Sequence, residues 1–449
     1  MVSEERHLFA TQRHIMEEMY IMKPYKSLSK EELFSLFQEL QTKYFELKNA
    51  GISLDMSRGK PGADQLDLSA PMLDVLNSAS SFKGAQGFDL RNYGQLDGII
   101  ETKELFGELM DAPVDHVMVY GNSSLNIMYD LISRAMLHGI GGNTPWCKQE
   151  SVKFLCPVPG YDRHFAITES FGIEMITIPM DENGPDMDLV EKYVNNDATV
   201  KGIWCVPKYS NPSGAVYSDE VVNRMAALKP AAADFRIFWD NAYAVHHLYP
   251  ENKAEIVNIV TACEKAGNPD MYYELCSTSK ITFPGSGVAA LITSPANIAE
   301  IKKSMTVQTI GHDKLNQMRH VMFFKNAEGI HKHMEKHAAL IRPKFEAVLN
   351  TLEEELGGLE IGTWLKPTGG YFIAFDTIPG CAKRVVSLCK EAGVVMTPAG
   401  STYPYMNDPQ DTSIRIAPTL PSPADLKKAC EVFVLCVKLA TVEKYLSEK

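Results

Sequence analysis

Apolar and polar positions along this chain follow two different periods, which together predict a mixed α/β protein. The first clear segment is an amphipathic helix over residues 30–49, and Gly51 follows it as a stop signal. Its apolar positions at helical spacing are Leu33, Phe34, Phe37, Leu40, Tyr44 and Leu47. A helix with one apolar face is stable when that face is covered, so we expect this helix to pack against the rest of the protein.

Between about residue 98 and residue 295, short apolar runs alternate with helical patterns. The runs predict strands at 116–120, 153–158, 174–179, 201–206, 235–240, 271–277 and 288–293. Helices are predicted between them, for example at 122–138, 162–171, 218–228 and 253–265. Buried strands that alternate with helices favour a mostly parallel sheet, here of seven strands, with helices on both faces.

The last third of the chain has a different pattern. Residues 312–356 are rich in Lys, His, Glu and Leu and predict long helices, and beyond them we expect strands within 359–376, 393–397 and 412–417 and helices near 380–392 and over 423–447. We therefore divide the chain into three parts. These are an N-terminal helix and segment that join the small domain (1–69), a large α/β domain (70–310) and a small α+β domain (311–449).

Composition narrows the class of protein. The chain has 449 residues, enough for two or three domains, and its formal net charge of −12 argues against a nucleic-acid partner. Nine cysteines without a Cys-x-x-Cys pair are typical of reduced thiols in a reducing compartment. Residues 1–14 lack the apolar stretch of a signal peptide, and no apolar run approaches the roughly 18 residues of a membrane span. We therefore expect a cytoplasmic enzyme that acts without a membrane or nucleic acid.

Two charged residues stand at the ends of predicted strands. Asp240 ends one strand, and Lys280 follows another, with Ser277 and Ser279 beside it. The carboxyl ends of parallel strands meet at one edge of a sheet, where open α/β sheets bind their ligands. An amine that can form a Schiff base and an acid that can keep a ring nitrogen protonated are the groups that pyridoxal 5′-phosphate chemistry requires. Taken alone, Asp240 could cap a helix and Lys280 could be an exposed surface residue.

Three further segments carry candidate binding groups. Asn122, Ser123 and Ser124 precede a predicted helix, where free N–H groups favour a phosphate, although an ordinary N-cap serine is the more common interpretation. Asn211 lies in an Asn-Pro-x-Gly turn after a buried strand and can offer its amide to a ring hydroxyl and to a carboxylate. Arg415 lies inside an apolar strand, where it could bind a carboxylate bidentately or form a structural salt bridge.

Along the chain these signals come in the order hydroxyl-rich turn, Asn-Pro-x-Gly, Asp-x-x-Tyr, Ser-x-Ser-Lys and then the arginine of the last strand. In that order and on one sheet, they resemble the fold type I pyridoxal-phosphate aminotransferases. The resemblance covers nearly the whole chain and implies their fold, a large domain with a mostly parallel sheet and a smaller α+β domain. It is closest to a divergent bacterial subgroup of aspartate aminotransferases, through segments 57–62, 91–94, 159–164 and 239–243. MocR-type regulators share this catalytic domain, but we do not expect their DNA-binding winged helix-turn-helix domain in this chain.

The resemblance implies a role for each candidate around the cofactor ring. Lys280 would be the Schiff-base lysine and the base that moves a proton between the substrate α-carbon and the cofactor C4′. Asp240 would pair with the pyridine nitrogen. Tyr243 and Asn211 would hydrogen-bond the ring hydroxyl, and Tyr161 would stack on the ring.

The resemblance also implies how the phosphate and the substrate are held. The phosphate would be bound by Asn122, Ser123, Ser124, Ser277 and Ser279, with Tyr93 reaching across from the other subunit of a homodimer. Arg415 would bind the substrate α-carboxylate, aided by Asn211 and the backbone near Gly59. The implied reaction is a ping-pong transfer from an amino acid, with aspartate favoured, to the 2-oxo acid 2-oxoglutarate, with pyridoxamine phosphate as carrier and oxaloacetate and glutamate as products.

One segment departs from the family pattern. Most of the superfamily has a phosphate-binding arginine shortly after the lysine, whereas residues 283–288 of this chain read Phe-Pro-Gly-Ser-Gly-Val. Another cation must take its place. The candidates are Arg58, Lys60, Arg91 and Arg319, which could instead bind the second carboxylate of a dicarboxylic substrate.

Other interpretations stay open. The amino donor could differ from aspartate, and a lyase or decarboxylase could use the same scaffold, because a fold does not fix a reaction. A cofactor-binding regulatory protein without turnover is the least favoured. His333 and His337 lie one helical turn apart and could bind a metal, but no third ligand is evident. We therefore expect a solvated helix face there and no metal site.

Overall fold

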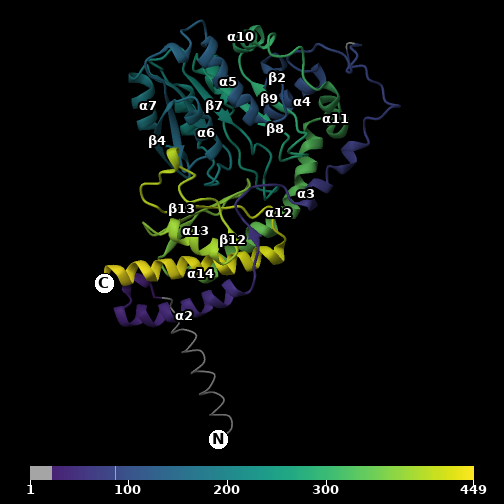
Figure 1. Ribbon diagram of the computed structural model, residues 1–449. Coiled ribbons are helices and arrows are strands. Elements are labelled where there is room, and N and C mark those ends of the chain that lie inside the picture. The colour runs from purple at the N-terminus through teal and green to yellow at the C-terminus, as the bar shows by residue number, and fades with distance from the viewer. Residues whose placement is uncertain (1–22, 86) are drawn as a thin grey trace.

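The computed structural model shown in Figure 1 describes residues 23–85 and 87–449. Our expectations for residues 1–22, that they contain no signal peptide and belong to the N-terminal part, lie outside the described residues. Two bodies are visible. The upper body holds an open sheet between helices, and the lower body holds two long helices side by side, α2 (Lys30–Asn49) and α14 (Pro423–Glu448). The α/β class predicted from the sequence is confirmed.

An eight-stranded sheet, in the order β2-β9-β8-β7-β6-β3-β4-β5, forms the centre of the upper body. Its strands are β2 (Val117–Val119), β3 (Lys153–Val158), β4 (Glu174–Asp181), β5 (Gly184–Pro185), β6 (Val200–Cys205), β7 (Arg236–Asp240), β8 (Tyr272–Ser277) and β9 (Ala289–Ile292). The strands from β8 to β4 are parallel, and β9 is antiparallel to both of its neighbours. All seven predicted strands are present. The two-residue β5, which pairs with the end of β4, is an eighth that the pattern did not reveal.

Neighbouring residues of the central strands point to opposite faces of the sheet, and both faces are apolar. Ile237 belongs to the hydrophobic cluster of one face and Phe238 to that of the other. Such strands must be covered on both sides. One face is covered by α7 (Met187–Asn196), α8 (Asp219–Ala226) and α9 (Ile259–Lys265), and the other by α5 (Ser124–His138), α6 (Asp162–Ser170) and α10 (Pro295–Met305).

The remaining α-helices and strands complete the two bodies. They are β1 (Leu54–Asp55), α3 (Ala63–Asp67), α4 (Ile100–Met110), α11 (Lys314–Phe324), α12 (Ala327–Leu356), β10 (Gly362–Trp364), β11 (Ile373–Thr377), α13 (Ala382–Glu391), β12 (Val394–Val395) and β13 (Ser413–Ile416). The predicted strand over 359–376 is confirmed only at its ends, as β10 and β11. Between them, Gly369 and Gly370 turn against the ring of Tyr209, where a Cβ on Gly369 would come within 2.3 Å of that ring.

The N-terminal helix packs as its apolar face predicted. Its start is fixed by a capping box between Ser29 and Glu32, and Leu33, Leu40 and Tyr44 are buried in the core of the lower body. Phe34, which we also placed on the apolar face, is 54% exposed. It lies one position beyond the buried stripe, so that expectation was wrong.

Helix α12 connects the two bodies. Ile330 and Met334 near its start pack with Leu105 of the upper body, whereas Ile341 and Phe345 lie in the core of the lower body. By this packing, the change from the upper to the lower body falls inside α12. The domain boundary that we placed near residue 311 stays a prediction. Within residues 23–85 and 87–449, no helix has both the length and the apolar character needed to cross a membrane.

Candidate active site

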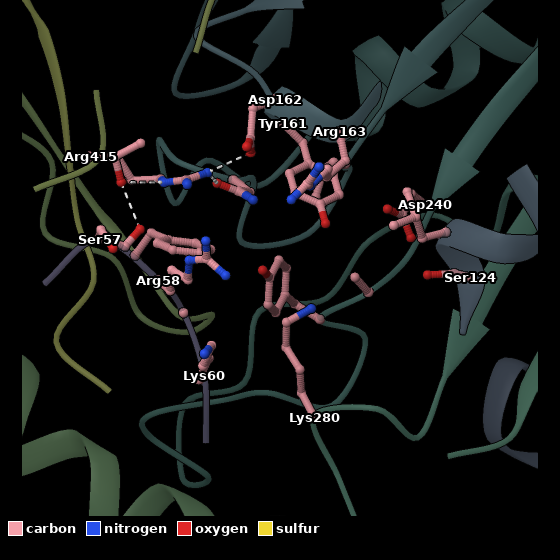
Figure 2. Close-up of a pocket in the computed structure, with 18 of the residues that line it drawn as sticks. Ser57, Arg58, Lys60, Ser124, Tyr161, Asp162, Arg163, Asp240, Lys280 and Arg415 are labelled. Carbon is pink, nitrogen blue, oxygen red and sulfur yellow. Dashed lines mark hydrogen bonds and ion pairs between the residues drawn. The ribbon is translucent and has the colours of Figure 1, made fainter. Parts of the chain in front are cut away.

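A cavity of about 500 Å³ lies between the two bodies, at the carboxyl ends of β6, β7 and β8. The lower body closes it with Phe372, Thr397 and other residues. Eight of the predicted site residues line it: Gly59, Ser124, Tyr161, Asn211, Asp240, Tyr243, Lys280 and Arg415. Figure 2 shows Lys280 directed toward the middle, with Asp240 on one side and Arg415 on the other. The strand-end argument is thus consistent with the structure in one respect, since the residues it singled out line a single cavity.

Lys280 is held in a position that favours its neutral amine. Burial lowers the pKa of the amine below its usual 10.5, and the charge of Asp240 opposes the shift. The Nζ atom lies 4.9 Å from the centroid of the Tyr243 ring. The Lys280 carbonyl accepts a hydrogen bond of 3.3 Å from the hydroxyl of Tyr371 in the lower body. A desolvated amine of this kind is a better nucleophile and base at neutral pH than a surface lysine.

Asp240 is a buried carboxylate with one oxygen engaged and one free. Its Oδ2 lies 3.1 Å from Nε2 of His164, and that imidazole stacks on Trp204 with the ring centroids 4.5 Å apart. Its Oδ1 is buried and has no hydrogen-bond partner among the described residues. Because an unpaired buried carboxylate oxygen is costly, this arrangement suits a ligand that brings a charged N–H to Oδ1.

His164 is a site residue that sequence reasoning missed. It lies in the segment 159–164 that carried the resemblance, but no role was given to it. A histidine two residues into a helix gives no signal on its own, and its partner Asp240 is 76 positions away.

The two tyrosines of the cavity are held as hydrogen-bond donors. Burial raises the pKa of Tyr243 well above its usual value and also raises that of Tyr161. The nearby Asp240 carboxylate adds to both shifts. Both phenols therefore keep their protons at neutral pH, so Tyr243 can donate to a ring oxygen as predicted.

Arg415 is 7% exposed and makes contacts on three sides. Its Nη1 donates to Oδ1 of Asp162 at 3.0 Å and to Oδ1 of Asn211 at 3.3 Å. Its Nε lies 3.4 Å from Oγ1 of Thr397, and its guanidinium lies over the ring of Phe372. The salt bridge that we left open as the alternative is thus present, in the form of an ion pair with Asp162 at the start of α6.

The glycine predicted near the substrate is required by packing. A Cβ on Gly59 would lie 2.4 Å from Cζ of Phe372, the ring that also supports Arg415. The hydroxyl of Thr397 donates to the carbonyl of Ser57 at 2.7 Å, which fixes this segment beside Arg415. The backbone near Gly59 can therefore come close to a ligand bound at the arginine.

Three further cations line the cavity, Arg58, Lys60 and Arg163. None of them forms an ion pair with a residue that the structure describes. With Arg415 they make the cavity a site for anions, in a chain whose overall charge is negative.

Of the hydroxyl groups predicted for the phosphate, Ser124 lines the main cavity, whereas Ser123, Ser277 and Ser279 lie beside it. Ser123 is the N-cap of α5, so the simple capping interpretation holds for it. The Ser279 hydroxyl donates to the carbonyl of Asn122 at 3.2 Å and accepts from Ser277 at 3.2 Å. Tyr93 is 76% exposed and does not line the cavity of its own chain.

The histidine pair of α12 is buried, so the expectation of a solvated face was wrong. Nε2 of His333 and Nε2 of His337 lie 3.1 Å apart, and Gln65 links His337 to the hydroxyl of Tyr371. Burial lowers the pKa of both imidazoles. Polar positions on α12 face this cluster because the helix passes between the two bodies. Among the described residues no group of three or more metal-ligating side chains is found.

We expect Asp162→Asn to tighten the binding of substrate-like dicarboxylates. A carboxylate ligand of Arg415 has to displace the Asp162 carboxylate, and removing that charge should lower the dissociation constant by about fivefold, the effect of roughly 1 kcal/mol. Calorimetric titration of the protein with succinate, which cannot react, measures this directly. Asp162→Glu keeps the charge and is the matched control. Weaker binding by Asp162→Asn would show that the aspartate orients Arg415 rather than competes for it.

Glu274 gives a prediction about stability. This residue of β8 is buried beside Asn241, and burial raises its pKa from 4.5 to about 7. Between these values the folded protein holds a proton that the unfolded chain releases, so this group makes stability fall as pH rises from about 4.5 to 7. Glu274→Gln should remove that fall and stabilise the protein at pH 8 by on the order of 3 kcal/mol. Denaturant unfolding of the variant and of the unmodified protein at pH 5 and pH 8 tests this prediction. If their free energies of unfolding differed by the same amount at both pH values, the prediction would be refuted.

Comparisons with known proteins concern the whole chain and its fold. The family model for aspartate amino-transferase matches residues 28–449. The chain is 46% identical to an aspartate aminotransferase of Corynebacterium glutamicum over 92% of this chain and 96% of that protein. A crystal structure of an aspartate transaminase from the same species superposes with a TM-score of 0.91 at 44% identity, over 94% of this chain and 99% of that one.

A more distant likeness concerns the fold alone. The α-aminoadipate aminotransferase LysN of Thermus thermophilus, solved in complex with N-(5′-phosphopyridoxyl)-L-leucine, superposes with a TM-score of 0.68 at 19% identity. The superposition covers 93% of this chain and 100% of that one. The same arrangement of sheet, helices and smaller body is therefore shared across both levels of similarity. The link to MocR-type regulators stays a prediction.

Proposed function

The chain belongs to the aspartate aminotransferase family, and we propose from this membership and its cavity that it transfers the amino group of aspartate to 2-oxoglutarate. The family is one of pyridoxal-phosphate-dependent transaminases. The proposal rests on one observation, that Lys280, Asp240 and Arg415 line the same cavity. An amine, an acid and a carboxylate-binding guanidinium are the three groups that such a reaction needs.

The residues present fit pyridoxal 5′-phosphate. Oδ1 of Asp240 is buried without a described partner and suits a protonated ring nitrogen, while Lys280 offers an amine of lowered pKa. Tyr243 and Asn211 would donate to the ring hydroxyl, and Tyr161 would lie against the ring. When bound, the cofactor supplies an aldehyde for amines and a ring that withdraws electrons from the substrate α-carbon.

The chain's own residues bind the substrate and move its proton. Arg415 binds the α-carboxylate through its fork of N–H donors once Asp162 gives way, with Asn211 beside it. The Lys280 amine would move a proton between the substrate α-carbon and C4′ of the cofactor, a role that a pKa below 10.5 favours near neutral pH. The cations Arg58, Lys60 and Arg163 of the cavity lining favour substrates with a second carboxylate, such as aspartate and 2-oxoglutarate.

We also propose that the active protein is a homodimer with shared sites. Tyr93 is 76% exposed and lies outside its own cavity, which supports the expectation that it serves a second copy. Sedimentation of the purified chain tests the assembly. Mixing a Lys280→Ala chain with a Tyr93→Phe chain tests the sharing, because a mixed dimer would regain one intact site.

The reaction is tested by half-reactions in the absence of 2-oxoglutarate. Aspartate alone should shift the absorbance of the bound cofactor to that of its aminated form and release about one equivalent of oxaloacetate per site. A lyase or decarboxylase would instead turn over repeatedly without that shift. A panel of amino donors with 2-oxoglutarate identifies the preferred one, and turnover with a donor other than aspartate would correct the proposed substrate.

A further inference from the structure

A second cavity, of about 420 Å³, lies on the other side of the segment that follows Lys280. It is bounded by Gly121 and Asn122, which lead into α5, and by residues 285–288. The opposite wall is formed by His312, which precedes α11, and by residues of α11 that include Asn316 and Arg319. The carbonyl of Asn122 accepts a hydrogen bond from the hydroxyl of Ser279. The cavity therefore adjoins the group of serines predicted for the phosphate.

Several polar atoms in this cavity are buried without a partner among the described residues. They are Nε of Arg319, Nε2 of His312 and Oδ1 of Asn316, and Asn316 itself is only 9% exposed. The lining also contains one acid, Asp313. It is the N-cap of α11, and its carboxylate accepts a hydrogen bond of 2.9 Å from the backbone N–H of Asn316. Burial lowers the pKa of His312, so its imidazole is neutral at neutral pH. Arg319 is therefore the permanent positive charge of this lining, and it makes no ion pair with any residue in 23–85 or 87–449.

Gly287 explains why the cation does not come from the segment itself. A Cβ at this position would lie 3.0 Å from the Asn122 carbonyl oxygen and 3.2 Å from the Ser279 nitrogen. Position 287 thus packs too closely on both the turn before α5 and the residue before Lys280 to carry a long side chain. Asn316 holds it from behind, since its Nδ2 donates to the carbonyls of Ser286 and Gly287 at 2.9 and 3.1 Å. The same helix carries Arg319 one turn further on.

We propose that Arg319 of α11 supplies the cation for the cofactor phosphate, in the place of an arginine that the segment after Lys280 lacks. This inference rests on the proposed function. The phosphate would lie between the free N–H groups at the start of α5, the serine hydroxyls and the Arg319 guanidinium, which offers it charge-assisted hydrogen bonds. Arg319 is a cofactor-binding residue in this assignment and takes no part in proton transfer.

The other candidate cations fit this role less well. Arg91 is exposed and held by Asp89, with Nε and Nη2 donating to that carboxylate at 2.9 and 2.6 Å. Arg58 and Lys60 line the main cavity beside Gly59, on the side where Arg415 binds the substrate carboxylate. They remain suited to the distal carboxylate of the substrate.

The test compares two ligands that differ only in the phosphate. The full chain, freed of cofactor, is titrated with pyridoxal 5′-phosphate and with pyridoxal, and the dissociation constants are read from absorbance. Arg319→Gln should weaken the binding of pyridoxal 5′-phosphate by about 10- to 100-fold and leave that of pyridoxal unchanged. Arg319→Lys should restore part of the loss. Arg91→Gln is the matched control and should change neither constant.

Each outcome decides a separate point. An equal loss for both ligands, or no loss for either, overturns the assignment of Arg319. If the unmodified chain bound neither ligand, the proposed function itself would fail. Inorganic phosphate gives an independent readout, because it should raise the melting temperature of the cofactor-free chain and should not raise that of the Arg319→Gln chain. Phosphate protection that survives in Arg319→Gln would also overturn the assignment, even if that variant folded poorly.

Discussion

Replacing Lys280 with alanine is expected to lower transamination by more than about 10⁴-fold. The side chain serves twice, as the amine that attaches the cofactor and as the base at the α-carbon, so one substitution removes both functions. No other lysine lines the main cavity except Lys60, within the residues that the structure describes, and Lys60 lies on the segment across from Asp240. Steady-state rates with aspartate and 2-oxoglutarate measure the loss. Lys280→Arg, which keeps a long basic side chain but lacks a primary amine, should be equally inactive.

The attachment point itself can be identified chemically. Reduction of the loaded protein with borohydride followed by peptide mapping should label Lys280 alone. Lys208 is the natural competitor, because burial lowers its pKa to about 8, but its Nζ donates to the carbonyl of Ala244 at 3.0 Å. Label on Lys208, or an active Lys280→Ala protein, would overturn the role of Lys280.

The lowered pKa of Lys280 also predicts a pH dependence. Only the neutral amine attacks an aldehyde, so the rate at which the cofactor-free protein captures pyridoxal 5′-phosphate should rise with pH and level off below 10.5. Asp240 opposes the lowering, so the plateau should begin at a still lower pH in Asp240→Asn. A rate that keeps rising beyond pH 10.5 would mark Lys280 as an ordinary exposed lysine.

The positions of the main groups were predictable because each stands at the end of a strand. Asp240 and Lys280 follow apolar runs long enough to be read as buried strands, and parallel strands bring such ends to one edge. The pairings around them were not predictable. Asp162 and Arg415 are 253 positions apart, and nothing local to either residue indicates the other.

Burial of helix faces was the other limit. The periodic pattern shows which positions of a helix are polar but not what covers them. His333 and His337 were therefore assigned to solvent, although both are buried, His337 beside Gln65 and His333 beside Ser69. The reverse error at Phe34 has the same cause, because one apolar residue can lie beside a buried stripe without joining it. From the sequence, the segment around Gly287 could be recognised only by the absence of an arginine. The contacts that exclude a side chain at this position became visible in the structure.

Asp240→Asn should lower kcat by about 10³-fold while the KM for aspartate changes little. The amide has the shape of the carboxylate but lacks the charge that keeps a ring nitrogen protonated, so the ring loses its power to withdraw electrons. Substrate binding depends on Arg415, whose contacts do not include Asp240. The pH titration of the absorbance of the bound cofactor provides a second readout, since loss of the charge alters the protonation of the ring.

The His164→Phe variant separates charge from positioning. The phenyl ring can still stack on Trp204, but Oδ2 of Asp240 loses the imidazole that lies 3.1 Å from it. Because the negative charge is kept and one hydrogen bond is lost, we expect kcat to fall by only about tenfold. If His164→Phe and Asp240→Asn were equally inactive, the carboxylate would act through its orientation rather than its charge. If Asp240→Asn kept activity within about threefold of the unmodified protein, the free oxygen of Asp240 would have no part in the reaction, and the case for a protonated ring nitrogen at this site would fail.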